Sequence, residues 1–496
     1  MSLTDILLPL LVMLVVSTVI ESLLIPRPIA IWRRDWQAVV LFVLTLCCLF
    51  GLYLAITRRP WLSAALTAGL PALLTGVSNV KFNQLREPLL YTDWRYFWEM
   101  IRYPALYLPY FGTWLAGGLL LLFVAALGVW LSIEAPALGW LDGVLLGAVL
   151  IILSGGLSVL VLRRWPTAQR LLNPLKDLQD WGGLAMHRVY RMRLNQPAVV
   201  APGPFLHLNK SDSVLPDIIC IQAESFVDRR RWDLDLKEAP KPALTNWDRL
   251  CDQSMMCGRL IVPSWGANTV RTEFAVLTGI DPERLSVHQF DPYRSLLMPS
   301  RLQGLVGLPA WLAGHGYRNA FVHPYERTFY DRHQVMPRLG FETFVDLTAF
   351  RKEDYVGRYV GDAAVGSVIQ EQIHPAHPSF VYAVTMQGHG PYGEGHESPD
   401  QWVKRYDQCI QSLDQMIGSL REALIARKRP AVLCVFGDHV PSMPSVYAQV
   451  GMPKRHTDFV IWQTGLDVPA GDHAQRCDLS ADRLAVEMLR AAGFRS

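Results

Sequence analysis

The chain has 496 residues, which is too many for one ordinary domain, so two or three folding units are expected. Its net charge of +3 and the lack of a basic stripe interleaved with aromatic residues argue against a nucleic-acid partner. The 8 cysteines do not amount to a disulfide scaffold, although Cys251 and Cys257 are close enough in sequence to bridge in an oxidising compartment.

The first third of the chain is dominated by long apolar runs. A membrane-spanning helix needs roughly 20 residues with few charges. The segments that meet this rule are Ile6–Leu24, Val39–Ile56, Trp61–Val80, Tyr107–Ile133 and Gly143–Leu162. We therefore predict a transmembrane bundle of five helices over residues 1–162, with the first span retained rather than cleaved as a signal peptide. The one charge within these spans, Glu21, lies near a span end and could reach the interface.

Basic residues are unevenly divided between the two sets of loops. The loops on one side carry only Arg58 and Arg59. The loops on the other side carry Arg27, Arg33, Arg34, Lys81, Arg86, Arg95, Arg102, Arg163 and Arg164. By charge count alone, the positive-inside rule places the C-terminal half in the cytosol. Binding of these residues to anionic lipid headgroups would produce the same distribution in the opposite orientation.

Residues 163–212 are predicted to form a juxtamembrane helix and a linker. The helix is expected over Arg163–Arg193, as a basic amphipathic element that lies on the membrane surface or packs on the following domain. Its apolar side would consist of Trp165, Leu171, Leu172, Leu175, Leu178 and Trp181. The stretch Asn195–Pro216, which contains several prolines, is typical of a linker.

In residues 213–496, short apolar runs alternate with helical stretches. The runs predicted to be buried strands are Asp217–Ala223, Ala320–Val322, Phe380–Thr385 and Ala431–Phe436. The clearest amphipathic helix between them is Asp400–Arg427. This alternation indicates an α/β domain with a mostly parallel sheet and helices on both faces.

Each predicted strand is followed by a carboxylate or a histidine, side chains that can bind a metal or transfer protons. Ligands of open α/β sheets bind beyond the carboxyl ends of the strands. The residues found there are Glu224, His323, His389, Asp438 and His439. Carboxylates and imidazoles together are the ligand set of a divalent ion such as zinc or manganese, so a metal site is predicted at this edge.

Thr269 is a candidate for the reacting oxygen at this metal site. It lies in WGANTVRTEF, where a Gly-Ala-Asn turn leads into a helical pattern. A threonine at a helix start most often caps the helix. The same exposed position suits a nucleophile, because a metal would help to remove its proton and the helix amides would hold a phosphoryl oxygen.

The combination of Glu224, Thr269 in GANTVRTEF, and Asp438-His439 in GDHVP resembles the lipoteichoic acid synthase family of the sulfatase-like, alkaline phosphatase superfamily. The segments VKFNQLREPLLYTDW and FVHPYERTFYDRHQVMPRLGFETF are also similar to stretches of that family. The resemblance covers nearly the whole chain. The residues around Thr269 depart from the family's commoner Gly-Lys-Thr-Ser form.

The resemblance implies a phosphoglycerol transferase. Thr269 would attack phosphatidylglycerol, releasing diacylglycerol, and a hydroxyl of an envelope glycan or polymer would then take the phosphoglycerol group. It implies one divalent metal ion, with Mn²⁺ expected and Zn²⁺ or Mg²⁺ as alternatives. The implied metal ligands are Glu224, Thr269, Asp438 and His439, and the implied substrate-binding residues are His323, Arg332 and His389. It also implies a multi-pass protein of the cytoplasmic membrane with residues 213–496 on the periplasmic or extracellular face.

Two other functions compete with this one. A phosphoethanolamine transferase acting on phosphatidylethanolamine would use the same threonine and metal. A non-catalytic membrane scaffold or lipid sensor would keep the site in degenerate form, and metal content would distinguish it from an enzyme. A sulfatase activity is disfavoured, because the chain has no Cys-x-Pro-x-Arg or Ser-x-Pro-x-Arg motif from which the modified nucleophile is made.

Overall fold

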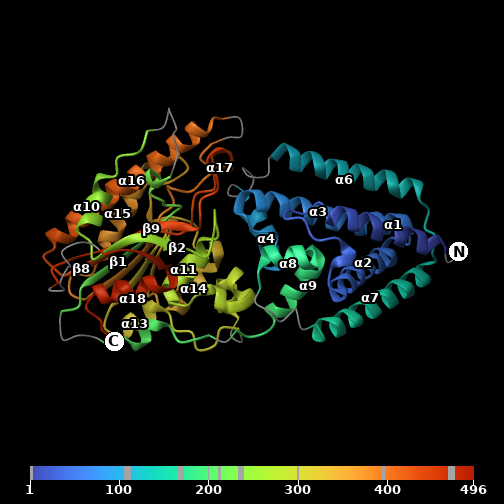
Figure 1. Ribbon diagram of the computed structural model, residues 1–496, viewed down its shortest axis with the longest axis horizontal. Coiled ribbons are helices and arrows are strands. Elements are labelled where there is room, and N and C mark those ends of the chain that lie inside the picture. The colour runs from blue at the N-terminus through green and yellow to red at the C-terminus, as the bar shows by residue number, and fades with distance from the viewer. Residues whose placement is uncertain are drawn as a thin grey trace. The chain divides into compact units, whose positions relative to one another are not determined.

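The computed structural model describes residues 4–104, 113–165, 172–198, 200–209, 214–232, 240–298, 301–393, 397–466 and 475–495. The chain forms two compact units, Met1–Gln196 and Pro197–Ser496 (Figure 1). The first unit is helical, and the second is built around a β-sheet.

Helices make up the first unit. They are α1 (Thr4–Glu21), α2 (Trp36–Thr57), α3 (Pro60–Leu85), α4 (Trp94–Arg102), α6 (Thr113–Ile133), α7 (Trp140–Arg163), α8 (Pro174–Trp181) and α9 (Gly183–Leu194). Within the described residues, α1, α2, α3 and α7 are long and apolar enough to cross a membrane, with mean hydropathies of 2.0, 2.8, 1.3 and 2.6. They correspond to four predicted spans. The remaining span, Tyr107–Ile133, lies partly outside the described residues, and its described part is α6.

Close packing of α2 on α7 depends on glycine. A Cβ atom at Gly147 would lie 2.4 Å from the carbonyl oxygen of Gly51, so neither helix could approach as closely with a larger residue there. Small residues are common where membrane helices pack closely. In apolar lipid the hydrophobic effect does not drive helices together, so their association depends on close packing.

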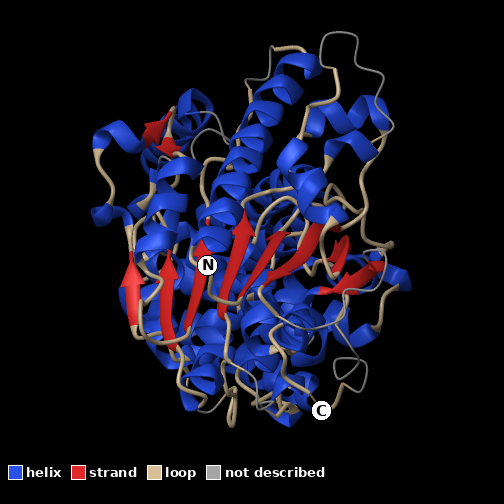
Figure 2. Ribbon diagram, turned by 90° about the vertical axis from the view of Figure 1, so that its left-hand side faces the viewer, coloured by secondary structure: helices blue, strands red, loops and turns tan. Residues whose placement is uncertain are grey.

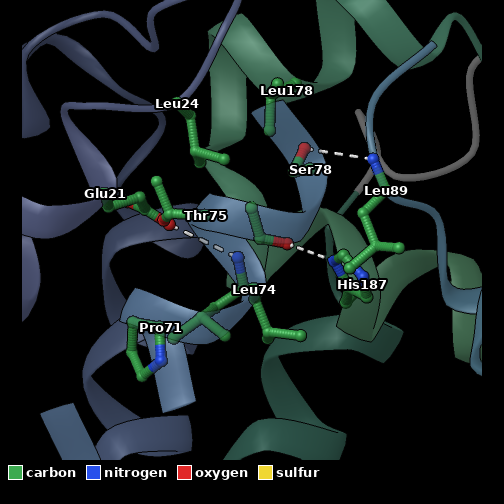
Figure 3. A pocket seen from close by; sticks show the side chains of 11 residues that line it. Glu21, Leu24, Pro71, Leu74, Thr75, Ser78, Leu89, Leu178 and His187 are labelled. Carbon is green, nitrogen blue, oxygen red and sulfur yellow. Dashed lines mark hydrogen bonds between the residues drawn. The ribbon is translucent and has the colours of Figure 1, made fainter. Parts of the chain in front are cut away.

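In the described residues of Arg163–Arg193, two short helices, α8 and α9, follow the end of α7 in place of the one amphipathic helix predicted. Gly182 separates them with a φ of +80°, a conformation that disfavours other residues. A buried ion pair between Arg34 and Glu21 lies against this turn, and Glu21 also accepts a hydrogen bond from the Leu184 amide at 3.3 Å. Beside it lies a small pocket of about 20 Å³, lined by the polar residues Glu21, Thr75, Ser78 and His187 and by apolar residues (Figure 3).

The second unit contains an eight-stranded sheet in the order β10-β2-β9-β8-β1-β7-β3-β4. Its strands are β1 (Asp217–Ala223), β2 (Met256–Ile261), β3 (Arg318–Val322), β4 (Thr343–Val345), β7 (Ser379–Val384), β8 (Ala431–Gly437), β9 (His456–Thr464) and β10 (Gln475–Ser480). Strand β9 runs antiparallel to both neighbours, and all other pairs are parallel, which confirms the predicted mostly parallel sheet. A separate hairpin joins β5 (Tyr355–Val356) to β6 (Tyr359–Val360).

Helices cover both faces of the sheet (Figure 2). The helices are α10 (Thr245–Asp252), α11 (Thr269–Thr278), α12 (Pro292–Leu297), α13 (Leu308–Gly314), α14 (Arg332–Leu339), α15 (Asp362–Glu371), α16 (Pro399–Ala426), α17 (Pro444–Val450) and α18 (Ala481–Ala491). Alternate residues of β1 enter two different cores: Ile218 and Cys220 pack with α11 and α18, whereas Ile219 and Ile221 pack with α10 and α16. Burial of the sheet on both sides explains why its central strands are continuous apolar runs.

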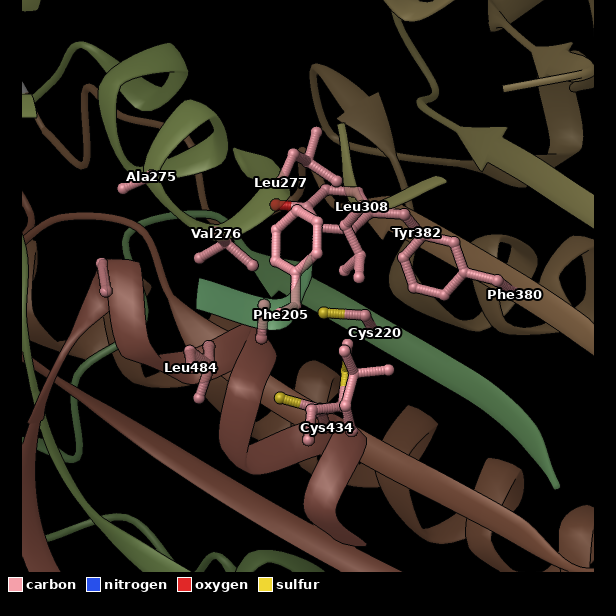
Figure 4. Packing of buried hydrophobic residues seen from close by; sticks show 14 of the residues in the cluster. Phe205, Cys220, Ala275, Val276, Leu277, Leu308, Phe380, Tyr382, Cys434 and Leu484 are labelled. Carbon is pink, nitrogen blue, oxygen red and sulfur yellow. The ribbon is translucent and has the colours of Figure 1, made fainter. Parts of the chain in front are cut away.

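The predicted linker Asn195–Pro216 is partly packed onto the second unit. Within it, Phe205 is fully buried beside Cys220, Cys434 and the α18 residue Leu484 (Figure 4). Asn209 pairs with Arg495 through two backbone hydrogen bonds of 2.7 and 3.0 Å. The cysteines are free thiols, Cys251 and Cys257 included.

The buried Asp362 yields a prediction about the pH dependence of stability. Burial raises the pKa of this carboxyl to about 7, whereas an unfolded aspartate titrates near 3.9. The unfolded chain therefore loses its proton first, and stability falls as the pH rises from about 4 to about 7. Asp362→Asn removes the ionisable carboxyl and with it this loss of stability at high pH. The variant should therefore be more stable than the wild type by about 2–4 kcal/mol at pH 8.

Denaturant unfolding of the full-length protein in detergent, followed by tryptophan fluorescence at pH 4.5 and 8, measures this difference. The gain should shrink strongly at pH 4.5. Asp400→Asn, in the first turn of α16 and not buried, is the matched control. An equal gain at both pH values would contradict the assignment to Asp362 ionisation.

Candidate active site

The pairing of β1 with β8 brings the first two site residues together. The two strands are parallel, and Ala223 lies opposite Gly437, the last residues of each strand. The next residues, Glu224 and Asp438, therefore leave the sheet side by side at the same edge.

Glu224, Asp438 and His439 form a compact group of potential metal ligands. Their ligand atoms all lie within 4.8 Å of one another, and the three side chains are buried. Nε2 of His439 is 3.5 Å from Glu224 Oε1 and 3.4 Å from Asp438 Oδ2. Burial and the neighbouring charge of Glu224 raise the pKa of Asp438 to about 7. Burial would lower the pKa of His439, but the two carboxylates outweigh it and the net shift is upward.

The hydrogen bonds around this group fit a metal ion. Oδ1 of Asp438 accepts from the amides of Ser225 and His439 at 2.8 and 2.9 Å, whereas Oδ2 is buried without a hydrogen bond of normal geometry to the described residues. Nδ1 of His439 is 3.1 Å from the carbonyl of Val440, which places the ring proton there and leaves the Nε2 lone pair facing the carboxylates. Two carboxylates and an imidazole are a suitable donor set for a divalent transition metal.

Thr269 is the first residue of α11, and it is partly exposed. Its Oγ1 lies 3.5 Å from Nε2 of His439, beside the metal-ligand group. The N-cap residue is Asn268, held at a φ of +66° and with no capping hydrogen bond from its side chain. Thr269 is therefore not the cap, and the amides of the first turn face the same region as its hydroxyl.

A second cluster lies at the end of β3. His323 follows that strand, and Arg332 is the first residue of α14. The NH1 group of Arg332 donates to Nε2 of His323 at 3.1 Å. Burial and the charge of Arg332 lower the pKa of His323 well below its ordinary value, so this imidazole is neutral.

His389 follows β7, the strand between β1 and β3. It is half-buried, and its Nδ1 is 2.7 Å from the carbonyl of Gly390 and 3.2 Å from the Tyr359 hydroxyl. The loop passes close to the metal-ligand group, because a Cβ atom at Gly388 would lie 2.3 Å from the carbonyl oxygen of Glu224. Glycine is needed there for the two loops to approach.

The structure thus brings Thr269 to the metal-ligand group and pairs His323 with Arg332. One residue that sequence reasoning missed is Glu273, on α11, which forms a buried ion pair with Arg332. A charged residue inside the apolar helical run EFAVL was the available signal, but its partner lies 59 positions away and only the fold identifies it.

Residues 216–494 match the sulfatase family, and the chain belongs to that family. Members of its superfamily are typically phosphotransferases or hydrolases, and the second unit carries a group of potential metal ligands. The chain is 29% identical over 443 residues to the capsular polysaccharide biosynthesis protein RkpI of Rhizobium meliloti, covering 83% of this chain and 79% of that protein. It is 28% identical over 313 residues to a putative cyclic β-1,2-glucan modification protein of the same organism, covering 56% of this chain and 46% of that one.

Among solved structures, the second unit is similar to the lipoteichoic acid synthase LtaP of Listeria monocytogenes. The match has a TM-score of 0.44 and 16% identity, and it covers 58% of this chain and 76% of that one.

Removal of either carboxylate should abolish stoichiometric metal binding. In Glu224→Gln and Asp438→Asn, a neutral amide replaces an anionic ligand, so affinity for a divalent metal should fall at least about tenfold. Elemental analysis and metal titration of the full-length protein measure this. Glu342→Gln, which changes an exposed carboxylate paired with Arg318 in the same unit, is the control. Unchanged metal content in both site variants would contradict the proposed ligand group.

Proposed function

We propose that this chain is a membrane-bound phosphoglycerol transferase that moves glycerol phosphate from phosphatidylglycerol to a hydroxyl of an envelope glycan or polymer. The observation that carries the proposal is the position of the Thr269 hydroxyl at the start of α11, 3.5 Å from His439 Nε2 and beside two buried carboxylates. A hydroxyl next to a metal-ligand group and at a helix N-terminus is suited to attack on a phosphate ester.

The lipid donor and the glycan acceptor have separate support. Helices long and apolar enough to cross a membrane precede the catalytic unit, which suits a substrate that resides in the bilayer. The motifs around Glu224, Thr269 and Asp438 resemble those of phosphoglycerol transferases. Two relatives are named for capsular polysaccharide biosynthesis and for modification of a cyclic glucan, which favours a carbohydrate acceptor.

In the first step, the Thr269 oxygen forms a bond to the phosphorus of phosphatidylglycerol, and the bond from phosphorus to the diacylglycerol oxygen breaks. The hydroxyl loses its proton, and the departing oxygen gains one to give diacylglycerol. The product on the protein is a phosphothreonine ester that carries glycerol. Mn²⁺ is our proposed ion for the ligands Glu224, Asp438, His439 and Thr269, and when bound it would lower the pKa of the Thr269 hydroxyl and offset negative charge on the phosphoryl oxygens.

In the second step, a hydroxyl of the acceptor attacks the same phosphorus, and the bond to the Thr269 oxygen breaks. The acceptor loses a proton and Thr269 regains one, so the net reaction exchanges one phosphodiester for another. Arg332 would bind the phosphoryl oxygens as their charge develops. His323, neutral and hydrogen-bonded to Arg332, would orient it. His389 would bind phosphate oxygens or exchange protons at the same sheet edge.

We propose that the catalytic unit lies on the outer face of the cytoplasmic membrane, where an envelope acceptor and the lipid headgroups meet. The exposed basic residues that flank the spans, Arg27 and Arg33 among them, would then lie beside anionic phosphatidylglycerol headgroups, which attract them. Reporter fusions after Ser496 test this orientation. Alkaline phosphatase activity without fluorescence from a green fluorescent protein fusion is expected, and the reverse pattern would place the unit in the cytosol.

The donor is tested by incubating full-length protein with labelled phosphatidylglycerol or, separately, phosphatidylethanolamine, with Mn²⁺ or Zn²⁺ supplied. We expect diacylglycerol from phosphatidylglycerol, and mass spectrometry should find phosphoglycerol on the Thr269 peptide. Thr269→Ala should reduce the rate by about 10³-fold or more, because it removes the nucleophile. Thr278→Ala, at the other end of α11, is the matched control.

Each alternative function predicts a different outcome of this assay. Release from phosphatidylethanolamine alone would keep the threonine chemistry and identify a phosphoethanolamine transferase. Release from neither lipid with either metal would favour the scaffold or lipid sensor. Release that persists in Thr269→Ala would rule out this nucleophile.

A further inference from the structure

Glu273 is a fully buried carboxylate on the helix that carries the proposed nucleophile. It lies four residues after Thr269, so the two side chains are on the same face of α11, about 6 Å apart along its axis. A buried carboxylate is costly unless it is paired and hydrogen-bonded, so its position in the fold calls for a compensating interaction.

That interaction is a two-point ion pair with Arg332. Nε of Arg332 donates to Glu273 Oε1 at 3.0 Å, and NH2 donates to Oε2 at 2.9 Å. Both side chains are almost completely inaccessible to solvent. Burial alone would lower the pKa of Arg332, but the adjacent carboxylate raises it above its ordinary value, so the guanidinium stays charged. The fork geometry fixes the plane of the guanidinium as well as its charge.

Glu273 is itself held by two further donors. The Tyr293 hydroxyl donates to Oε1, and Gln222 Nε2 donates to Oε2 at 3.4 Å. Burial and the charge of Glu273 raise the pKa of Tyr293 well above its ordinary value, so this hydroxyl keeps its proton and remains a donor. Gln222 is in turn fixed by the Tyr382 hydroxyl, which donates to its carbonyl oxygen at 2.5 Å. The carboxylate therefore has a single orientation.

Arg332 is left with a defined free edge. A guanidinium has five N–H groups. Two are used by Glu273 and one by His323, and the ring of Tyr330 lies 5.3 Å from the guanidinium carbon. The two other N–H groups, on NH1 and NH2, have no hydrogen-bond partner among the described residues, and the Arg332 side chain is 1% exposed.

We propose that Glu273 is a positioning residue that orients the free N–H edge of Arg332 toward the phosphoryl group attacked by Thr269. The proposal rests on the function proposed above, since it presumes that Arg332 binds the transferred phosphate. Because Thr269 and Glu273 share one rigid helix, the nucleophile and the anion-binding guanidinium keep a constant spacing. Glu273 touches neither the substrate nor the metal and acts through Arg332.

Glu273→Gln tests the proposal with inorganic phosphate as the probe, titrated into full-length protein loaded with Mn²⁺. The amide keeps the shape of the side chain but loses the charge and one acceptor. The dissociation constant for phosphate should rise about tenfold or more, since charge-assisted pairs are the stronger hydrogen bonds. Metal content should not change. Glu342→Gln, the same substitution at an exposed pair with Arg318, should have no effect.

A double-mutant cycle with Arg332→Met separates positioning from a general structural role. If Glu273 acts through Arg332, adding Glu273→Gln to Arg332→Met should change phosphate affinity less than twofold. A tenfold additional loss in that background would overturn the proposal. A lower melting temperature with unchanged phosphate affinity in Glu273→Gln would overturn it as well.

Tyr293→Phe keeps the proposal testable if Glu273→Gln does not fold. It retains both charges and removes one hydrogen bond that orients Glu273, so phosphate affinity should fall severalfold at unchanged metal content. Wild-type affinity in this folded variant would contradict the proposal. Diacylglycerol release by the wild type is scored separately. If phosphate binding depends on Glu273 but no diacylglycerol is released, only the proposed function is contradicted. If diacylglycerol release is intact in Glu273→Gln, only the positioning role is contradicted.

Discussion

The in-register pairing of β1 with β8 is the constraint on which the site depends. It places Glu224 and Asp438 beside each other in a buried position, where two like charges are costly. Amide donors from Ser225 and His439 and the imidazole of His439 reduce that cost only in part. Within the described residues, neither carboxylate has a lysine or arginine within 4.0 Å. A divalent cation bound to both carboxylates would offset the repulsion between them.

Helix α11 contacts both the metal-ligand group and Arg332, which is hydrogen-bonded to His323. Its first residue presents the candidate nucleophile, Thr272 donates a hydrogen bond of 2.7 Å to the carbonyl of Asp438, and Glu273 holds Arg332. The candidate nucleophile, the contact with Asp438 and the contact with Arg332 therefore all come from residues 269–273. The Thr269 hydroxyl, the loop after β8 and the Arg332 guanidinium are all held by this one helix. If the helix shifted, they would move together, so their mutual distances would be preserved.

The sequence predicted strands β1, β3, β7 and β8 of the large sheet but not β2, β4, β9 and β10. Strands β1, β3, β7 and β8 are buried on both faces, so they appear as apolar runs, and their ends locate Glu224 and Asp438 without further information. Strand β2 and the edge strand β10 carry Arg259 and Asp478, an exposed pair between them, and so lack that signature. Glu273 could not be assigned because its role comes from contacts with Arg332, Tyr293 and Gln222, which only the tertiary structure brings together.

In each unit, a buried glutamate is paired with an arginine. Glu21 was expected to reach the membrane interface, but it is buried and paired with Arg34 against the turn at Gly182. Glu273 is paired with Arg332 in the second unit. The arginine in each case supplies a permanent positive charge and several hydrogen-bond donors to the acid. Glu224 and Asp438 have only a titratable imidazole, so their charge is free to be balanced by a ligand. Glu224 and Asp438 therefore differ from Glu21 and Glu273 in having no permanent counter-charge, and a bound cation could supply one.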